Sequence, residues 1–112
     1  ACLQHTGVLS HYPLSRLIAD WSLLDGQEKA FAESSFSHVD FLLYNTLTKQ
    51  PTCAIEVDGW HFHKENDAQQ TRDVLKNQIF TKIGLRLLRI STTDTVNKET
   101  IKDSLLEILS RT

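Results

Sequence analysis

The segment from Cys53 to Ile90 constrains the fold more than any other part of the chain. It opens with "CAIEVD" (53–58), which alternates apolar and polar residues as a strand does. A helix is predicted over Asn66–Ile83, ended by Gly84, and "LRLLRI" (85–90) has the few polar positions expected of a central strand. A strand, a long helix and a second strand in succession indicate an α/β domain.

The segments on either side complete this picture. Five apolar residues at helical spacing, followed by a break at Asp25-Gly26, predict one or two amphipathic helices within 13–35. These five are Leu14, Leu17, Ile18, Trp21 and Leu24. A strand is predicted over 37–45, a polar turn over 46–52 and a closing helix over 97–112. The expected fold is therefore a small mixed β-sheet flanked by helices.

The length and composition suit one globular domain. The chain has 112 residues, 40% of them hydrophobic and 23% charged. We divide it into an N-terminal helical part (1–35), a core (36–93) and a C-terminal helix (94–112). Twelve basic and fourteen acidic residues give a net charge of -2, so any polyanion must be met by a local patch or through a bound metal.

Cysteine usage and hydropathy indicate the compartment. With only Cys2 and Cys53, the chain has no basis for a disulfide framework, and it has no leader and no apolar run of about 18 residues. We expect a cytoplasmic protein with no membrane partner. The start at "ACLQ" and the lack of any Met lead us to expect a piece of a longer polypeptide.

Acidic residues gather on the predicted strands. Glu56 and Asp58 are two positions apart, so their side chains project from one face, about 7 Å apart along the strand. If the preceding strand pairs with theirs as a hairpin, Asp40 joins them on that face. Three such carboxylates repel one another unless a hard cation such as Mg²⁺ or Mn²⁺ lies between them. The alternative is a polar sheet face exposed to water.

The predicted helix has a face that changes character along its length. At 100° per residue, one arc carries apolar residues in its C-terminal half, namely Leu75, Ile79, Phe80 and Ile83. The same arc carries Gln69, Arg72 and Lys76 in its N-terminal half. Polar groups facing a sheet need partners, and the carboxylate face could supply them. Alternatively, Arg72 and Lys76 extend along the helix edge to water.

A carboxylate-held metal beside a Lys or Arg is suited to phosphodiester hydrolysis. The metal activates water and stabilises the leaving oxygen, and the cation offsets charge in the transition state.

The motifs "VDF", "EVDG" and "RD..K" within Ser37–Thr93 resemble the PD-(D/E)XK nuclease superfamily, which has the restriction-endonuclease-like fold. More closely, the segment is similar to DUF2726 and DUF559 domains, relatives of the very-short-patch-repair endonucleases. Such domains are often appended to superfamily 1 DNA helicases. The resemblance therefore implies a nuclease domain that acts on DNA, with a helicase module in the same polypeptide.

The resemblance also assigns roles to individual residues. Asp40 and Glu56 match the metal-binding acids, whereas Asp58 stands where many members have the catalytic Lys. Either Asp58 is a third ligand and the positive role has moved to Lys76 or Arg72, or the domain binds DNA without cutting it. An acid from the first helix often joins such sites, and both Glu28 and Glu33 are candidates.

The segment after "EVDG" adds further candidates. His63 falls close to a His of the family that could position water or contact phosphate. His61 and His63 also suggest zinc, but the strand parity of Cys53 directs it away from the carboxylates. Trp60 and Phe62 could stack on bases or simply pack.

The expected function is that of a Mg²⁺-dependent deoxyribonuclease. Asp40, Glu56 and Asp58 would hold the metal, Lys76 would act with them, and His63, Gln69 and Arg72 would contact the substrate. The alternatives are a non-catalytic DNA-binding or interaction module of the same fold and a hydrolase of small phosphoesters. Many such nucleases form homodimers to cut both strands, but no interface can be read from this sequence.

Overall fold

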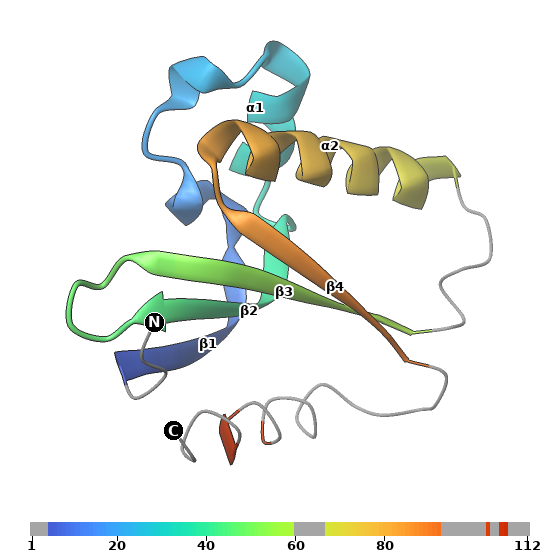
Figure 1. The fold of residues 1–112 in the computed structure, drawn as a ribbon. Coiled ribbons are helices and arrows are strands. Elements are labelled where there is room, and N and C mark those ends of the chain that lie inside the picture. The colour runs from blue at the N-terminus through green and yellow to red at the C-terminus, as the bar shows by residue number, and fades with distance from the viewer. Residues whose placement is uncertain (1–4, 60–66, 93–102, 104–105, 108–112) are drawn as a thin grey trace.

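The computed structural model describes residues 5–59, 67–92, 103 and 106–107. Its elements follow in the order β1 (Thr6–Pro13), η2 (Leu14–Leu17), η3 (Trp21–Leu23), α1 (Gly26–Glu33), β2 (His38–Asn45), β3 (Pro51–Gly59), α2 (Asp67–Ile83) and β4 (Arg86–Thr92). Both α-helices lie over the same face of the sheet, and α2 runs back roughly along the direction of β3 before the chain enters β4 (Figure 1).

The four strands form one mixed sheet in the order β1-β2-β3-β4. The first three strands are antiparallel neighbours, and β4 pairs with β3 in parallel after the crossover through α2. The expectation of an α/β domain with a small mixed sheet is confirmed. The predicted hairpin of β2 and β3 is present, and its turn is held by the Asn45 Oδ1 atom, which accepts hydrogen bonds from the Leu47 and Thr48 N–H groups.

Both helices have clear end signals in the sequence. At the start of α1, Asp25 and Glu28 form a capping box, in which each side chain accepts a hydrogen bond of 2.8 Å from the other's backbone N–H. At the end of α2, Gly84 adopts a φ of 74°, which costs a glycine little. The Leu85 N–H then reaches the Phe80 carbonyl at 3.1 Å and the Gly84 N–H reaches that of Thr81, as in a Schellman motif.

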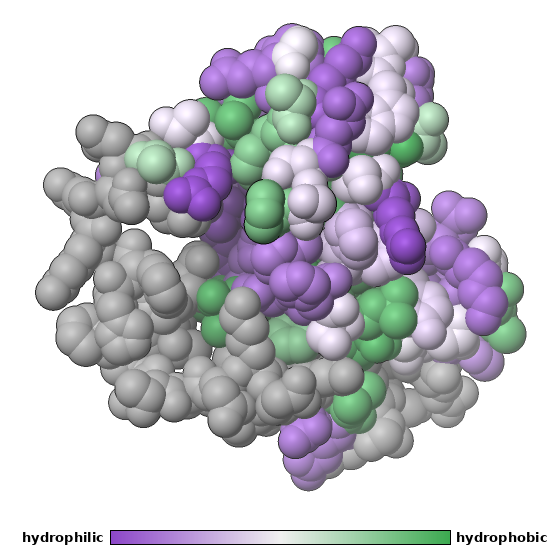
Figure 2. Space-filling model, turned by 180° about the vertical axis from the view of Figure 1, so that it is seen from behind, coloured by the Kyte–Doolittle hydropathy of each residue, from purple (hydrophilic) through white to green (hydrophobic). Residues whose placement is uncertain are grey.

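The sheet buries apolar residues on both faces. On the helix side, Leu42 and Ala54 belong to one buried cluster with Ile79 and Phe80 of α2. On the opposite side, the central strands contribute Phe41, Cys53 and Ile55 to a second cluster. From behind, hydrophobic side chains form separate patches among hydrophilic ones (Figure 2). Because α2 covers the helix side of β2 and β3, side chains on that side are enclosed between the sheet and the helix.

The N-terminal third differs from the prediction. In place of an amphipathic helix over residues 14–24, the chain forms the two short 3-10 turns η2 and η3. Leu14, Ile18 and Leu24 are buried as their spacing suggested, but an irregular segment that crosses the helix side of the sheet buries them. Tertiary packing thus overrides a helical pattern here.

Strand β1 was not predicted, because its sequence contains Gly7 and lies at the sheet edge. Its pairing with β2 creates it, and Gly7 lies opposite Tyr44. A Cβ atom at Gly7 would come within 2.5 Å of the Tyr44 ring. The glycine that weakens the strand signal is therefore required by a cross-strand neighbour.

Strand β4 was predicted at nearly its observed bounds, but its predicted central position is wrong. Among the described strands it lies at an edge, with Leu88 and Ile90 exposed. The predicted closing helix over 97–112 lies almost wholly outside the described residues. No helix in the described part of the chain is long and apolar enough to span a membrane.

Candidate functional site

Two buried carboxylates meet on the helix side of the sheet. Asp40 on β2 is 7% exposed, and Glu56 on β3 is 8% exposed. Asp40 precedes Phe41 and Glu56 follows Ile55, and Phe41 and Ile55 are partners in the antiparallel register of β2 and β3. The same register therefore places the two acids opposite each other. Asp40 Oδ2 accepts a hydrogen bond of 2.8 Å from the Val57 N–H, which fixes this carboxylate against β3.

Lys76 of α2 joins this pair from above the sheet. Its Nζ atom forms an ion pair with Glu56 Oε1 and also donates to the His38 carbonyl oxygen at 3.0 Å. Only 13% of the Lys76 side chain and 10% of the Glu56 side chain are exposed. The predicted association of Lys76 with the carboxylate face is therefore present, and three separate elements supply the group.

The environment of Glu56 favours its neutral form. Burial raises the pKa of the Glu56 carboxyl, because a charge is poorly solvated there. Lys76 acts against this effect through its charge and its hydrogen bond, whereas the nearby Asp40 carboxylate raises the pKa of Glu56 further. A second cation near the two carboxylates would offset both the cost of burying the Glu56 charge and the repulsion between Glu56 and Asp40.

Arg89 is a neighbouring cation that the sequence did not reveal. It pairs with Glu56 in the parallel register of β3 and β4, and its charge lowers the pKa of Glu56. Its guanidinium lies 3.5 Å from Asp73 and donates to Asn77 Oδ1 of α2 at 3.0 Å. A polar residue in "LRLLRI" was the only available signal, and it gains meaning only when the parallel register is known.

Arg72 is not brought to the carboxylates. It is exposed, and its Nε atom donates to the Ala68 carbonyl oxygen of its own helix at 3.3 Å. Of the two alternatives for Arg72, the structure therefore has the one in which the side chain extends along the helix to water. Its predicted contact with a substrate stays a prediction.

The two candidate acids of the first helix have different positions. Glu33 is exposed, whereas Glu28 is 1% exposed. Glu28 Oε1 accepts hydrogen bonds from the Asp25 N–H and, at 2.6 Å, from Lys82 Nζ. Glu28 therefore caps α1 and links it to α2.

Several predicted positions lie outside what the structure describes. Asp58 belongs to β3, where it pairs with Ser91, and Gln69 belongs to α2, but their side chains are outside the described residues. His61, His63, Trp60 and Phe62 lie outside them entirely. Within the described part, no group of three or more His, Cys, Asp or Glu residues could hold a metal. Cys53 faces the opposite cluster, as its parity predicted, and burial raises the pKa of its thiol.

These features define an α/β domain with two carboxylates and a lysine buried between the sheet and α2. The model of the family DUF2726, described as a protein of unknown function, matches residues 4–108. Since this match spans nearly the whole chain, the protein belongs to the DUF2726 family. Neither the curated proteins nor the solved structures contain a significant match to it.

Proposed function

We propose that this protein is a metal-dependent nuclease domain with a restriction-endonuclease-like core, which hydrolyses phosphodiester bonds in DNA. The observation that carries the proposal is the convergence of Asp40, Glu56 and Lys76 from β2, β3 and α2. Burying two adjacent carboxylates costs stability, and apolar residues at the same positions would not have this cost, so a role in chemistry accounts for their presence.

The donor set fits Mg²⁺ or Mn²⁺. Mg²⁺ in enzymes is typically held by one or two carboxylates, with waters and substrate phosphates completing its shell. Asp40 and Glu56 supply two hard oxygen donors, and Asp58 would add a third. When bound there, the ion would supply activation of water and stabilisation of the leaving oxygen.

The chain's own residues prepare this reaction. The Val57 N–H orients the Asp40 carboxylate, and the His38 carbonyl holds the Lys76 ammonium beside Glu56. A lysine at this position can offset the negative charge that grows on the phosphate in the transition state. Lys76 would thus take the role that the lysine of the strand motif has in many nucleases, from a different element. Arg89 adds positive charge at the same strand level.

A second candidate function is a DNA-binding module without cleavage. The Lys76–Glu56 ion pair supports it, because the lysine already neutralises one of the two acids without a metal. DNA binding by such a module would be insensitive to chelator and would weaken as salt increases.

The direct test is nicking of supercoiled plasmid DNA in Mg²⁺ and in Mn²⁺ by the 112-residue chain. We expect the Glu56→Ala variant to lose at least 100-fold in rate, because it lacks a carboxylate of the proposed metal site. Glu33→Ala is the matched control, since it removes an exposed acid from the same chain and should cleave as the unchanged protein does.

Thermal unfolding with and without Mg²⁺ separates the two functions independently of activity. A ligand that binds only the folded state raises the melting temperature. Mg²⁺ should therefore stabilise the unchanged protein and the Glu33→Ala variant, but not Glu56→Ala. No cleavage and no Mg²⁺ stabilisation, together with salt-dependent DNA binding, would favour the module without cleavage.

A further inference from the structure

A cleft lies away from the carboxylates, between η2 and the β2–β3 hairpin. It has a volume of about 600 Å³, within the range of sites that hold small organic molecules. Eleven residues line it: Leu9, Tyr12, Arg16, Leu17, Ala19, Leu42, Tyr44, Lys49, Gln50, Pro51 and Ile83. None of these eleven is acidic, so a metal cation has no carboxylate ligand among them.

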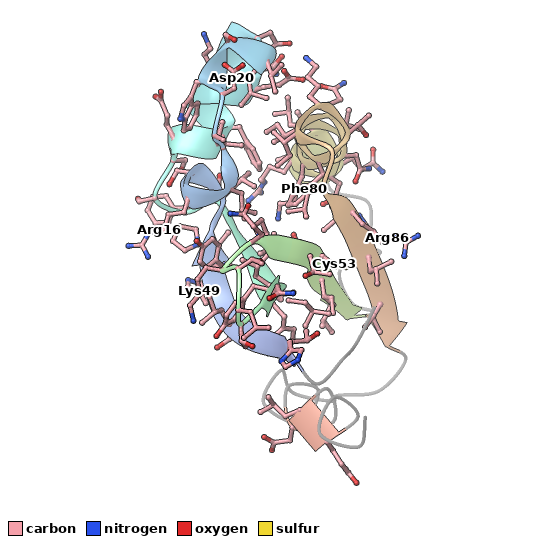
Figure 3. The ribbon with its side chains drawn as sticks, turned by 60° about the vertical axis from the view of Figure 1, so that its left-hand side comes forward. Arg16, Asp20, Lys49, Cys53, Phe80 and Arg86 are labelled. Atoms are coloured by element: carbon pink, nitrogen blue, oxygen red, sulfur yellow. The ribbon has the colours of Figure 1, made fainter. Side chains whose placement is uncertain are left out.

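The rim of this cleft is cationic. Arg16 of η2 and Lys49 of the hairpin turn are both exposed, and both lie on the same side of the molecule (Figure 3). Arg16 gives a planar guanidinium and Lys49 a compact ammonium, and both groups bind phosphate oxygens well. The rim therefore suits an anionic group, although the whole chain has a net charge of -2.

The walls and the floor suit a flat ring. Tyr12 and Tyr44 are half-buried, whereas Leu42 at the floor is only 3% exposed. The Tyr44 ring lies against Gly7, so closely that a Cβ atom on this glycine would come within 2.5 Å of the ring. An aromatic side chain held in this way can stack on a base with little loss of side-chain entropy.

The hairpin presents Lys49 in a fixed backbone conformation. Lys49 has a φ of 64°, which is uncommon for a residue with a side chain. Its N–H donates to the Asn45 carbonyl at 2.8 Å, and the Asn45 side chain holds the two preceding N–H groups. The positive φ of Lys49 is thus part of the turn that joins β2 to β3, and it fixes the backbone from which the Lys49 side chain extends.

We propose that this cleft binds a nucleotide unit, with its phosphate between Arg16 and Lys49 and its base against Tyr12 and Tyr44. The unit could come from a free mononucleotide or from a single strand of DNA, since both present the same phosphate and base. The site does not depend on the carboxylates or on a metal. It can therefore be measured in chelator, where failure of the nuclease proposal has no effect on the result.

The test uses the 112-residue chain in EDTA with two probes. Binding of the mononucleotide dTMP is measured by calorimetry, and binding of a fluorescein-labelled twelve-residue oligothymidylate by anisotropy. The Arg16→Gln/Lys49→Gln double variant should weaken binding at least tenfold. For the oligonucleotide it should also reduce the slope of log affinity against log salt by about 1.4, because two phosphate contacts are lost.

The matched control is Lys29→Gln/Arg86→Gln, which changes the net charge equally at residues outside the cleft lining, with Arg86 on the opposite side of the molecule (Figure 3). It should change affinity less than twofold. Stacking is tested without a mutation by an abasic oligonucleotide of equal length, which should bind about 5- to 150-fold more weakly for each stacked base that is lost.

The results separate the sources of the ligand. Binding of dTMP that is sensitive to the double variant identifies a free mononucleotide as sufficient, whereas sensitivity confined to the oligonucleotide identifies a strand. The proposal is overturned if neither probe binds, if both double variants weaken binding equally, or if the abasic strand binds as well as oligothymidylate.

Discussion

Helix α2 carries two lysines that each pair with a buried glutamate, and the two pairs have different surroundings. Lys82 meets Glu28, which also belongs to the capping box of α1. Lys76 meets Glu56, which lies beside a second buried acid, Asp40. The Lys82 side chain is 39% exposed, whereas the Lys76 side chain is 13% exposed.

The difference separates a structural pair from a candidate site. All the described contacts of the Glu28 carboxylate tie α1 to its own start and to α2. Glu56 instead stands next to a like charge, an arrangement that weakens the fold unless a cation is present. Two lysines of the same helix therefore have different roles, and the elements that surround each lysine–glutamate pair determine which role it has.

The largest expected contrast concerns cleavage. Lys76→Met should reduce the rate of plasmid nicking about 100- to 1000-fold, the usual effect of removing a group that stabilises transition-state charge. Lys82→Met removes the same charge six residues later and should leave the rate within about twofold. Comparable losses in both variants would show that the two pairs are equivalent and would remove the basis for a site at Lys76.

The next contrast concerns stability, for which we expect the glutamate of the Lys82 pair to matter more than the glutamate of the Lys76 pair. Glu28→Ala should lower the free energy of unfolding by about 2 kcal/mol, because it removes half of the capping box and leaves Lys82 without this partner. Glu56→Gln should cost less, because it also relieves repulsion with Asp40. Urea denaturation of both variants gives the comparison, and a larger loss for Glu56→Gln would contradict it.

The pH dependence of stability tests the electrostatics of Glu56. Because burial raises the pKa of Glu56 in the folded state, protonation favours folding. This contribution is fully present below the carboxyl's ordinary pKa and is lost as pH rises through the raised folded-state value. Relative to Glu56→Gln, the unchanged protein should lose stability over that interval, with a slope of at most about 1.4 kcal/mol per pH unit. Parallel stability curves for the two proteins would refute the assignment.

The smallest expected effect comes from Gly84, just after the last turn of α2. Gly84→Ala meets no atom within 4 Å, so its cost of about 1 kcal/mol should arise from the positive φ alone. The last turn contains Lys82, so loosening it should weaken the Glu28 pair and leave cleavage unchanged. A parallel fall in cleavage would indicate that the two pairs are coupled through the helix.

Much of the core was predictable because its signals are local. The alternation in β2 and β3, the helical spacing of α2 and the glycine after it gave these elements near their observed bounds. Asp40, Glu56 and Lys76 were expected to be neighbours and the structure brings them together, because strand parity and a helical arc fix which side chains face each other. Their role as a site stays a prediction.

The failures have a common cause, which is dependence on distant partners. Arg72 fits the same helical arc as Lys76, but it is exposed and its Nε atom donates to the Ala68 carbonyl of its own helix. The apolar spacing of residues 14–24 is satisfied by 3-10 turns, and β1 exists through its pairing with β2. Arg89 approaches Glu56 only because β4 is parallel to β3.

The sequence by itself determined the α/β class, the central hairpin, the long helix and the two acids that face it, since periodicity and end signals act over a few residues. The tertiary structure decided which glutamate caps a helix and which one meets Asp40, and it placed Arg16 and Lys49 at one cleft. These outcomes depend on contacts between residues far apart in the chain. Their physical basis is the packing of α2 and η2 against the sheet to which the β2–β3 hairpin belongs.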